Sequence, residues 1–428
     1  MVNVAVLGYG TVGSGVAEIL WKNQSHVNRR AGEEINLKYV LDLREFPGDP
    51  VEKVLVHDFD TIVNDPEIRV IAEAMGGLEP AYTFAKRALE KGISFCTSNK
   101  VLVEAKGAEL IEIAKEHDAN FFFEASVGGG IPVIRPMIEC LTADHFDEIS
   151  GILNGTTNFM LTKMDQEGVA YDEVLTEAQE LGYAERNPEA DVEGHDAGRK
   201  IAILASLNSE KQVSFESLSM EGITKITNID FEYARSLESS IKLLGSARKK
   251  DGKSYALVAP FMVPSSDPLY AVNGVYNAIK LHGDMLENVM FYGQGAGKEA
   301  TASAVVSDIQ DCVRRLGSHR EILWSREPAE LGDIMEYPFR FLVRVKDEGE
   351  EEQSSGGPTV GSAATLKAGV VGGKLAQFAA ALGGAGRLVA PRGVTGEAAF
   401  LTKPMSEKEL NAAIESTGVS VIGRIRLA

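Results

Sequence analysis

A hydrophobic run that passes directly into closely spaced glycines opens this chain. Residues 2–8 read VNVAVLG, and Gly8, Gly10 and Gly13 follow with the spacing GxGxxG before a helical pattern begins. In a strand–turn–helix unit, the first glycine permits a tight turn and the second lets the backbone approach a pyrophosphate. The third allows close helix–strand packing, and the helix N-terminus faces the anion. The feature predicts a dinucleotide-binding unit at the start of the chain.

Short apolar runs and amphipathic stretches alternate over the first 135 residues. After the opening run, strands are predicted at 35–42, 70–75, 93–98 and 120–126. This alternation indicates parallel βαβ units with right-handed crossovers. We therefore predict an α/β protein whose residues 1–135 form a Rossmann dinucleotide-binding domain.

Polar and glycine residues end several of these strands. Asp42 closes the second strand, where a carboxylate accepts the ribose hydroxyl of NAD, whereas Arg44 could face the 2′-phosphate of NADP. Gly77 follows the third strand and allows bare backbone beneath a ribose. Lys100 follows the fourth, at the edge where open α/β sheets bind ligands, so it is a candidate proton donor or anion binder. NAD and NADP both remain open.

A second unit is predicted between residues 136 and 318. Its strands are expected at 151–155, 255–263 and 272–281, and its helices near Asp196, at 234–249 and at 300–316. The mixture is typical of an α+β domain, to which we assign substrate binding, catalysis and dimerisation. Its last helix, 300–318, is expected to return toward the first domain.

A third, smaller unit is predicted over residues 335–428. Strands are expected at 337–346, 397–403 and 419–427, and helices at 372–384 and 406–417. The second of these helices begins with a capping box formed by Ser406 and Glu409. An acidic, Gly/Ser-rich segment at 347–362 is typical of a mobile insertion. The alternation suggests a regulatory or dimerisation module of the split βαβ type.

Charge and cysteine content limit the class of protein. The net charge of −19 at pH 7 argues against a nucleic acid or an anionic membrane as partner. Three cysteines are too few and too scattered for a disulfide framework or a zinc site, which favours a reduced compartment. The first residues lack the pattern of a signal peptide, and no apolar run approaches the roughly 20 residues that span a bilayer. We expect a soluble cytoplasmic protein with a small-molecule ligand.

Two further stretches combine polar residues or glycines with a buried neighbour. In the charged segment 183–200, Asp196 and Lys200 lie four residues apart, on one face of a helix that an apolar run holds in the core. A helix-start ion pair worth a few tenths of a kcal/mol explains this as well as a catalytic pair does. The run EASVGGGIP at 124–132 points to backbone groups facing a ligand or a hard monovalent cation, or to an interdomain turn.

Six sequence blocks together resemble the homoserine dehydrogenases. They are VLGYGTVG, SNKVLV, EASVGGGIPVIRP, GILNGTTNFML, LGYAERNPEADVEGHDAGRK and YGQGAGKEATASAVVSDI, in the family's order over about residues 1–318. The resemblance implies NAD(P)-dependent interconversion of aspartate 4-semialdehyde and homoserine, on the route from aspartate to threonine, methionine and isoleucine. It also implies a homodimer or homotetramer.

The resemblance also implies roles for individual residues. The residues that transfer the proton, or orient the one that does, would be Lys200, Lys100 and Asp196. The substrate would be bound by Glu185, Asp191 and Asp196. The cofactor would be lined by Gly8, Tyr9, Gly10, Thr11, Val12, Gly13, Gly77, Lys100, Gly182, Gly295 and Gly297, beside Asp42 and Arg44. A structural sodium or potassium ion would be held by Glu124 and the carbonyls of Val127, Gly129 and Ile131.

Two features depart from the family pattern. Leu41 stands where many bacterial relatives carry an arginine, so recognition of a 2′-phosphate would depend on Arg44. The C-terminal unit is similar to an ACT domain, a ligand-sensing βαββαβ module. Its usual Asp-x-Pro-Gly-Val-Leu-like turn is replaced by the acidic segment and KAGVVGGKLAQF, so inhibition by threonine is a hypothesis only.

Two other functions compete with this interpretation. An acylating aldehyde dehydrogenase would use Cys96 as nucleophile, but the local motifs offer no histidine to activate it. A nucleotide-sensing protein without turnover would not need a buried proton donor, and the presence of Lys200 speaks against it.

Overall fold

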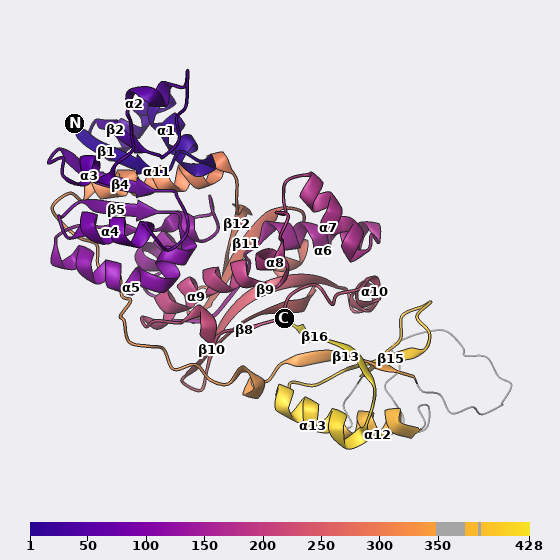
Figure 1. Cartoon of the computed structure of the whole chain (residues 1–428). Helices are drawn as coiled ribbons and strands as arrows, with labels where there is room; N and C mark the ends of the chain where they lie inside the picture. Colours follow the sequence, from indigo (N-terminus) through magenta and orange to yellow (C-terminus); the bar gives the residue numbers. More distant parts are fainter. Residues whose placement is uncertain (348–372, 384–386) are drawn as a thin grey trace.

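Two β-sheets organise the computed structural model, which describes residues 1–347, 373–383 and 387–428. A 6-stranded sheet has the order β3-β2-β1-β4-β5-β6, and a 10-stranded sheet has the path β12-β11-β7-β9-β10-β16-β13-β15-β14, with β8 on β10. The first sheet lies at one end of the molecule and the C-terminal module at the other, with the central sheet between them (Figure 1). Among the described residues, no helix combines the length and apolarity that a membrane span requires.

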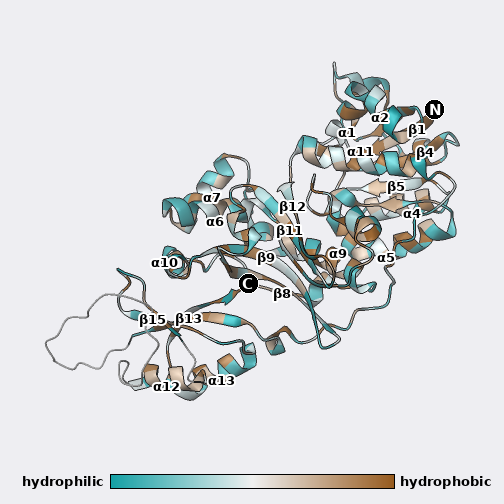
Figure 2. Ribbon diagram, turned by 180° about the vertical axis from the view of Figure 1, so that it is seen from behind, coloured by the Kyte–Doolittle hydropathy of each residue, from teal (hydrophilic) through white to brown (hydrophobic). Residues whose placement is uncertain are grey.

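The first sheet is parallel throughout and confirms the predicted Rossmann-type unit. Its strands are β1 (Val2–Leu7), β2 (Ile35–Leu41), β3 (Leu55–Val56), β4 (Ile68–Glu73), β5 (Ser94–Thr97) and β6 (Phe121–Phe122). Its helices are α1 (Thr11–Lys22), α2 (Gln24–Ala31), α3 (Phe59–Val63), α4 (Ala81–Leu89) and α5 (Lys100–Glu116). The strand expected at 120–126 is shorter, because Glu124–Ser126 form a 3₁₀ turn. Seen from behind, α4 and α5 carry both hydrophilic and hydrophobic residues, as surface helices over a core do (Figure 2).

The central sheet is mixed and is covered by helices. Its strands are β7 (Phe146–Ile152), β8 (Ser219–Met220), β9 (Ser239–Lys250), β10 (Lys253–Pro264), β11 (Tyr276–Gly283) and β12 (Glu287–Gln294). The helices between them are α6 (Gly155–Glu167), α7 (Tyr171–Glu180), α8 (Glu189–Val192), α9 (His195–Ser209) and α10 (Asn228–Ser236). The strand expected at 151–155 is displaced, since β7 ends at Ile152 and α6 already begins at Gly155. A last helix, α11 (Lys298–Arg314), returns to the first sheet and packs against α1, as expected.

The helix predicted at 234–249 is wrong. The helix α10 ends at Ser236, and the residues from Ser239 onward form β9, which pairs with β10 on one side and β7 on the other. Its leucines and lysines and its one alanine favour a helix intrinsically. However, nine consecutive residues from Ser239 are buried, which is the pattern of a strand covered on both faces rather than of a surface helix. Tertiary pairing therefore overrides local preference here.

The C-terminal residues form a βαββαβ unit. Its elements are β13 (Arg340–Lys346), α12 (Gly373–Ala381), β14 (Arg387–Val389), β15 (Glu397–Leu401), α13 (Glu407–Thr417) and β16 (Val421–Leu427). The capping box of Ser406 and Glu409 is present at the start of α13. Strand β16 pairs in parallel with β10, which makes this unit's sheet continuous with the central one. Nearly all of the acidic segment 347–362 lies outside the described residues.

Candidate functional site

Three charged side chains meet at the start of α9. The Nζ of Lys200 donates to Oδ2 of Asp196 at 2.7 Å and to the backbone oxygen of Leu153 at 2.8 Å. Lys100, the first residue of α5, lies with its Nζ 2.9 Å from Oδ1 of the same aspartate. Asp196 therefore bridges two lysines, one from a helix of the first sheet and one from a helix of the central sheet.

Asn154 joins this cluster to a second carboxylate. It is the N-cap of α6, where its Oδ1 accepts a hydrogen bond from the amide of Thr157 at 2.8 Å. Its Nδ2 donates to Oδ2 of Asp196 at 2.9 Å and to Oδ1 of Asp191 at 2.7 Å. Asn154 lies within the sequence block GILNGTTN, which predicted no role for it. An asparagine directly before a helical pattern is a strongly preferred N-cap, and this pattern could have indicated its structural role.

The pKa values of the two aspartates are shifted in opposite directions. Burial alone would raise the pKa of Asp196, but the charges and hydrogen bonds of Lys200 and Lys100 hold it well below its usual range. Burial raises the pKa of Asp191, and the neighbouring Asp196 charge acts in the same direction, against the hydrogen bond from Asn154. Asp196 is therefore a permanent anion between two cations, whereas Asp191 retains affinity for a proton or for a positively charged ligand.

The glycine loop has the geometry that the motif demands. Gly8 has a φ of 93°, in the left-handed region, and a Cβ on Gly13 would lie 1.8 Å from the oxygen of Gly8. Gly10 is the N-cap of α1, and Thr11 and Val12 form its first turn. The free amides at this helix end face the space where a pyrophosphate would bind.

Asp42 and Arg44 form an ion pair with each other. The guanidinium of Arg44 donates from Nε to Oδ1 and from NH2 to Oδ2 of Asp42, both at 2.9 Å. The backbone amide of Tyr9 donates to Oδ2 of Asp42 at 2.7 Å. The hydrogen bonds from Arg44 hold the pKa of Asp42 well below its usual range. The pair leaves the Arg44 side chain largely in solvent, beside the glycine loop.

A buried carboxylate supports the adjacent loops, and sequence reasoning missed it. Glu73 ends β4 and is fully buried, and its Oε1 accepts hydrogen bonds from the amides of Met75 at 2.6 Å and Gly76 at 3.0 Å. Its Oε2 accepts one from the hydroxyl of Thr97 at 2.5 Å. Asn99 in turn donates to the oxygen of Gly77 at 2.5 Å. A glutamate inside the apolar run VIAEAM was the signal that could have indicated this role.

The glycine run at 128–130 packs against the turn that precedes α11. A Cβ on Gly129 would lie 2.5 Å from the oxygen of Gly295, and one on Gly130 would lie 2.9 Å from Cβ of Ala300. Gly297 is the N-cap of α11, whose first turns lie against Gly15 of α1. The structure thus brings the predicted residues Gly295 and Gly297 to the same side of the molecule as the glycine loop.

The residues expected to hold a monovalent cation are only partly suited to it. The carboxylate of Glu124 is committed to backbone amides, those of Val133, Ile134 and Arg135, at 2.7–2.8 Å. By contrast, in the described part of the chain no hydrogen bond ends on the backbone oxygens of three buried residues, Val127, Gly129 and Ile131. Oxygens without a donor are the ligands that hard cations prefer. The carbonyls fit such an ion better than the carboxylate does.

Comparison with known proteins gives a consistent result. A family model described as "Homoserine dehydrogenase" matches residues 132–310, and one described as "Homoserine dehydrogenase, NAD binding domain" matches residues 8–124. The homoserine dehydrogenase of Synechocystis is 44% identical over 326 residues, which is 75% of each chain. That of Bacillus subtilis is 41% identical over 357 residues, covering 81% of this chain and 82% of the relative.

The chain belongs to the homoserine dehydrogenase family. The prediction of an NAD(P)-dependent oxidoreductase is therefore confirmed. A crystal structure of a homoserine dehydrogenase from Thiobacillus denitrificans superposes with a TM-score of 0.84 at 33% identity, covering 100% of this chain and 98% of that one. A hyperthermophilic archaeal homoserine dehydrogenase mutant, solved in complex with NADPH, has a TM-score of 0.61 at 29% identity over 73% of this chain.

Two residues that the family resemblance implied are not brought to the Asp196 cluster. Glu185 and Gly182 lie in the exposed turn between α7 and α8. The backbone oxygen of Glu185 accepts a hydrogen bond from Gln179 at 3.2 Å. Its carboxylate forms no hydrogen bond or ion pair within the described ranges.

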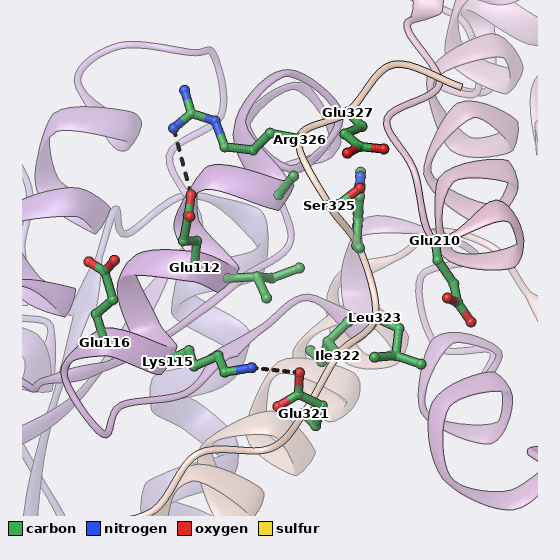
Figure 3. A pocket seen from close by; sticks show the side chains of 13 residues that line it. Glu112, Lys115, Glu116, Glu210, Glu321, Ile322, Leu323, Ser325, Arg326 and Glu327 are labelled. Atoms are coloured by element: carbon green, nitrogen blue, oxygen red, sulfur yellow. Dashed lines mark hydrogen bonds and ion pairs between the residues drawn. The ribbon is translucent and has the colours of Figure 1, made fainter. Parts of the chain in front are cut away.

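A cavity of about 640 Å³ lies elsewhere and is separate from the cluster. It is enclosed by α5, by Glu210 after the C-terminal end of α9, and by the segment 321–327 (Figure 3). Ion pairs of Lys115 with Glu321 and of Arg326 with Glu112 line it. Asp196 and Glu210 are separated by about 20 Å along the helix axis. None of the residues that line the cavity belongs to the cluster around Asp196.

Proposed function

We propose that this chain catalyses the NAD(P)-dependent interconversion of L-aspartate 4-semialdehyde and L-homoserine, on the route from aspartate to threonine, methionine and isoleucine. The observation that carries the proposal is Asp196, which holds Lys200 and Lys100 together where the helices of the two sheets meet. Membership of the homoserine dehydrogenase family supports the choice of substrate. The glycine loop at the start of α1 supports the choice of cofactor.

The chemistry requires a cation that can also carry a proton. A bound nicotinamide cofactor supplies or accepts the hydride. When an aldehyde is reduced, negative charge develops on its oxygen, so a positively charged donor within hydrogen-bond reach lowers the barrier. We assign Lys200 to donate this proton, and to accept it back when homoserine is oxidised. Asp196 orients Lys200, and Lys100 provides a second positive charge on the cofactor side.

The acidic groups are assigned to the amino end of the substrate. Homoserine is a zwitterion, and its ammonium group needs a carboxylate partner inside the site. Asp191 is half-buried and, in the described part of the chain, has Asn154 as its one side-chain hydrogen-bond donor, which leaves capacity for a ligand. Glu185 is assigned to the same ammonium group. These roles remain proposals for both residues.

The nicotinamide cofactor is proposed to lie along the loop of Gly8, Tyr9 and Gly10 and to approach Gly77 and Gly297. Either form of the cofactor suits Asp42 and Arg44. If Arg44 stays on Asp42, the carboxylate has little capacity left for a ribose hydroxyl. If it turns outward, its guanidinium can bind a 2′-phosphate. The archaeal relative solved with NADPH favours the phosphorylated cofactor.

Further proposals concern the ion, the C-terminal unit and the assembly. We propose a structural sodium or potassium ion on the carbonyls of Val127, Gly129 and Ile131, with Glu124 beside it rather than as its direct ligand. The βαββαβ order supports an ACT-like module, with threonine as a hypothetical effector. We also propose a cytoplasmic homodimer or homotetramer. Absence of inhibition by millimolar threonine, with the C-terminal unit folded, would remove the effector from this scheme.

The competing acylating mechanism is disfavoured by the surroundings of Cys96. The residue is fully buried in β5, and burial raises the pKa of its thiol, with Cys312 as a neighbour. A nucleophilic cysteine needs an accessible thiolate. An acyl-enzyme at Cys96 would therefore require a large rearrangement of the first sheet.

The test is the initial rate of homoserine oxidation, with NAD and then with NADP, for wild type and Lys200→Ala. We expect wild type to turn over and the variant to lose roughly 10²–10⁴-fold in kcat while still binding cofactor. Lys211→Ala is the matched control, since this exposed lysine lies just beyond the other end of α9 and should leave the rate unchanged. Wild type that binds a cofactor but turns over with neither would favour a nucleotide sensor instead.

A further inference from the structure

The helices α5 and α9 meet at a second ion pair, one turn beyond the contact between Lys100 and Asp196. Glu104 follows Lys100 by four residues on α5, and Arg199 directly precedes Lys200 on α9. NH1 of Arg199 donates to Oε2 of Glu104 at 3.1 Å. The two helices belong to different layers, because α5 follows β5 of the first sheet whereas α9 packs on β9 and β10.

Glu104 is fixed from several sides. The residue is 4% exposed, and its Oε1 accepts a hydrogen bond from the amide of Phe215 at 3.0 Å. The side chain of Gln212 donates to the backbone oxygen of Glu104 at 2.8 Å. Burial raises the pKa of Glu104, against the effects of Phe215 and Arg199. These partners hold the Glu104 carboxylate in one position.

Arg199 is fixed as well. Its guanidinium carbon lies 4.3 Å from the centroid of the Phe215 ring, over which it stacks. Phe215 thus contributes its backbone to Glu104 and its ring to Arg199, and it locks the pair. The pair lies outside the polar cluster itself, since within the described residues no hydrogen bond or ion pair joins Glu104 or Arg199 to Asp191 or Asn154.

We propose that Glu104 and Arg199 are positioning residues for the reaction proposed above: they hold α5 against α9 so that Lys100 stays on Asp196 and the cofactor side of the site stays aligned with Lys200. Helices are stiff over one turn, so a fixed contact at Glu104–Arg199 restricts the distance between Lys100 and Asp196. A misplacement of about 1 Å at reacting groups can reduce a rate by roughly 10²-fold. The pair acts through Lys100 and does not touch the reacting atoms.

The test compares Glu104→Gln and Arg199→Lys with wild type in kcat, in KM for homoserine and in cofactor affinity. Glu104→Gln keeps an acceptor for the Phe215 amide, but it removes the charge and replaces the oxygen that accepts from Arg199 with an NH2 group. We expect kcat/KM to fall roughly 10- to 100-fold in both variants, with cofactor affinity unchanged. Glu109→Gln is the control, because Glu109 lies on the same helix but pairs with Tyr82 and Lys106 rather than with α9.

A double-mutant cycle with Lys100→Met separates positioning from general support of the fold. If the pair acts through Lys100, adding Glu104→Gln to Lys100→Met should cause little further loss, measured as the residual rate at high enzyme concentration. Equal losses in both backgrounds would overturn the proposal. The proposal would also be overturned if the kcat/KM of both Glu104→Gln and Arg199→Lys fell only in proportion to the unfolded fraction of each variant, measured by thermal unfolding. Wild type without homoserine turnover would instead overturn the proposed function, and that rate is measured first.

Discussion

The central sheet meets its two neighbours through joints that are built differently. Toward the first sheet, α5 and α9 make the contact through side chains, and the side chain of Lys100 stays 37% exposed within it. Toward the C-terminal unit, β10 pairs directly with β16, and the side chain of Arg344 is 5% exposed. Both joints contain buried ion pairs, but Lys100 at the first joint stays partly exposed whereas Arg344 at the second is closed to solvent.

The hydrogen bonds of Arg344 at the second joint are made to protein groups, without a ligand. Arg344 donates to both carboxylate oxygens of Glu397 at 2.9 and 2.8 Å, and its NH1 donates to Oδ1 of Asp230 at 2.6 Å. The hydrogen bond from Arg344 lowers the pKa of Glu397. Perturbed carboxylates therefore occur at both joints, and perturbation alone does not identify a functional site. Remaining access to solvent distinguishes the contact of Lys100 with Asp196 from the buried group around Arg344.

Among the variants that compare the two joints, the largest effect is expected from Asp196→Asn at the first joint. The substitution removes the anion between Lys100 and Lys200, so the two ammonium groups repel each other and lose their common acceptor. We expect kcat/KM to fall roughly 10²–10³-fold, in steady-state assays with saturating cofactor. Retention of more than half the activity would show that the bridge is not needed.

The same variant has a pH signature in stability. Because the pKa of Asp196 is lowered in the folded state, its ion pairs contribute stability above the unfolded value, near pH 4, and lose it as pH falls toward the folded pKa. The difference in unfolding free energy between wild type and Asp196→Asn should therefore shrink as the pH is lowered below about 4. A difference that stays constant from pH 6 to pH 3 would contradict this.

At the second joint, Arg344→Met should affect stability rather than activity. The change leaves Asp230 and Glu397 buried without their cation, and breaking a buried pair in this way typically costs about 3–5 kcal/mol. Denaturant unfolding should show this loss, while kcat per folded molecule stays near wild type. The control is Lys408→Met, in an exposed pair with Asp333 and Glu336, which should leave unfolding nearly unchanged. Loss of kcat in folded Arg344→Met would mean that the C-terminal joint also serves catalysis.

The two joints also differ in how far the sequence could predict them. The glycine loop and the Asp196–Lys200 spacing are local patterns, and both formed as expected. The pair of Glu104 and Arg199 spans 95 residues between helices of different sheets, so no local pattern indicates it. Strand β9 was mistaken for a helix because a strand covered on both faces has neither an alternating nor a helical pattern.

The smallest expected effect lies in the central sheet between the joints, at a cation that has no carboxylate partner. Lys242 of β9 is 1% exposed, and its Nζ donates to the backbone oxygen of Val272 at 2.6 Å and to Oδ1 of Asn273 at 2.8 Å. In the described part of the chain it forms no ion pair. Burial lowers its pKa to about 8, so the folded chain releases this proton before the unfolded chain does.

The sign of the pH effect follows from this order of proton release. Between pH 8 and about 10.4 the unfolded state binds more protons at Lys242, so the stability of wild type rises with pH relative to Lys242→Met. The shift should total roughly 3 kcal/mol, read from denaturant unfolding of both proteins in half-unit steps from pH 7.5 to 10.5. Lys253→Met, at an exposed lysine that begins β10, is the control and should follow wild type throughout. A flat difference for Lys242→Met would mean that its two hydrogen bonds offset the effect of burial on the ammonium group. A buried lysine without a carboxylate partner would then not differ from one with such a partner in the way its burial affects stability.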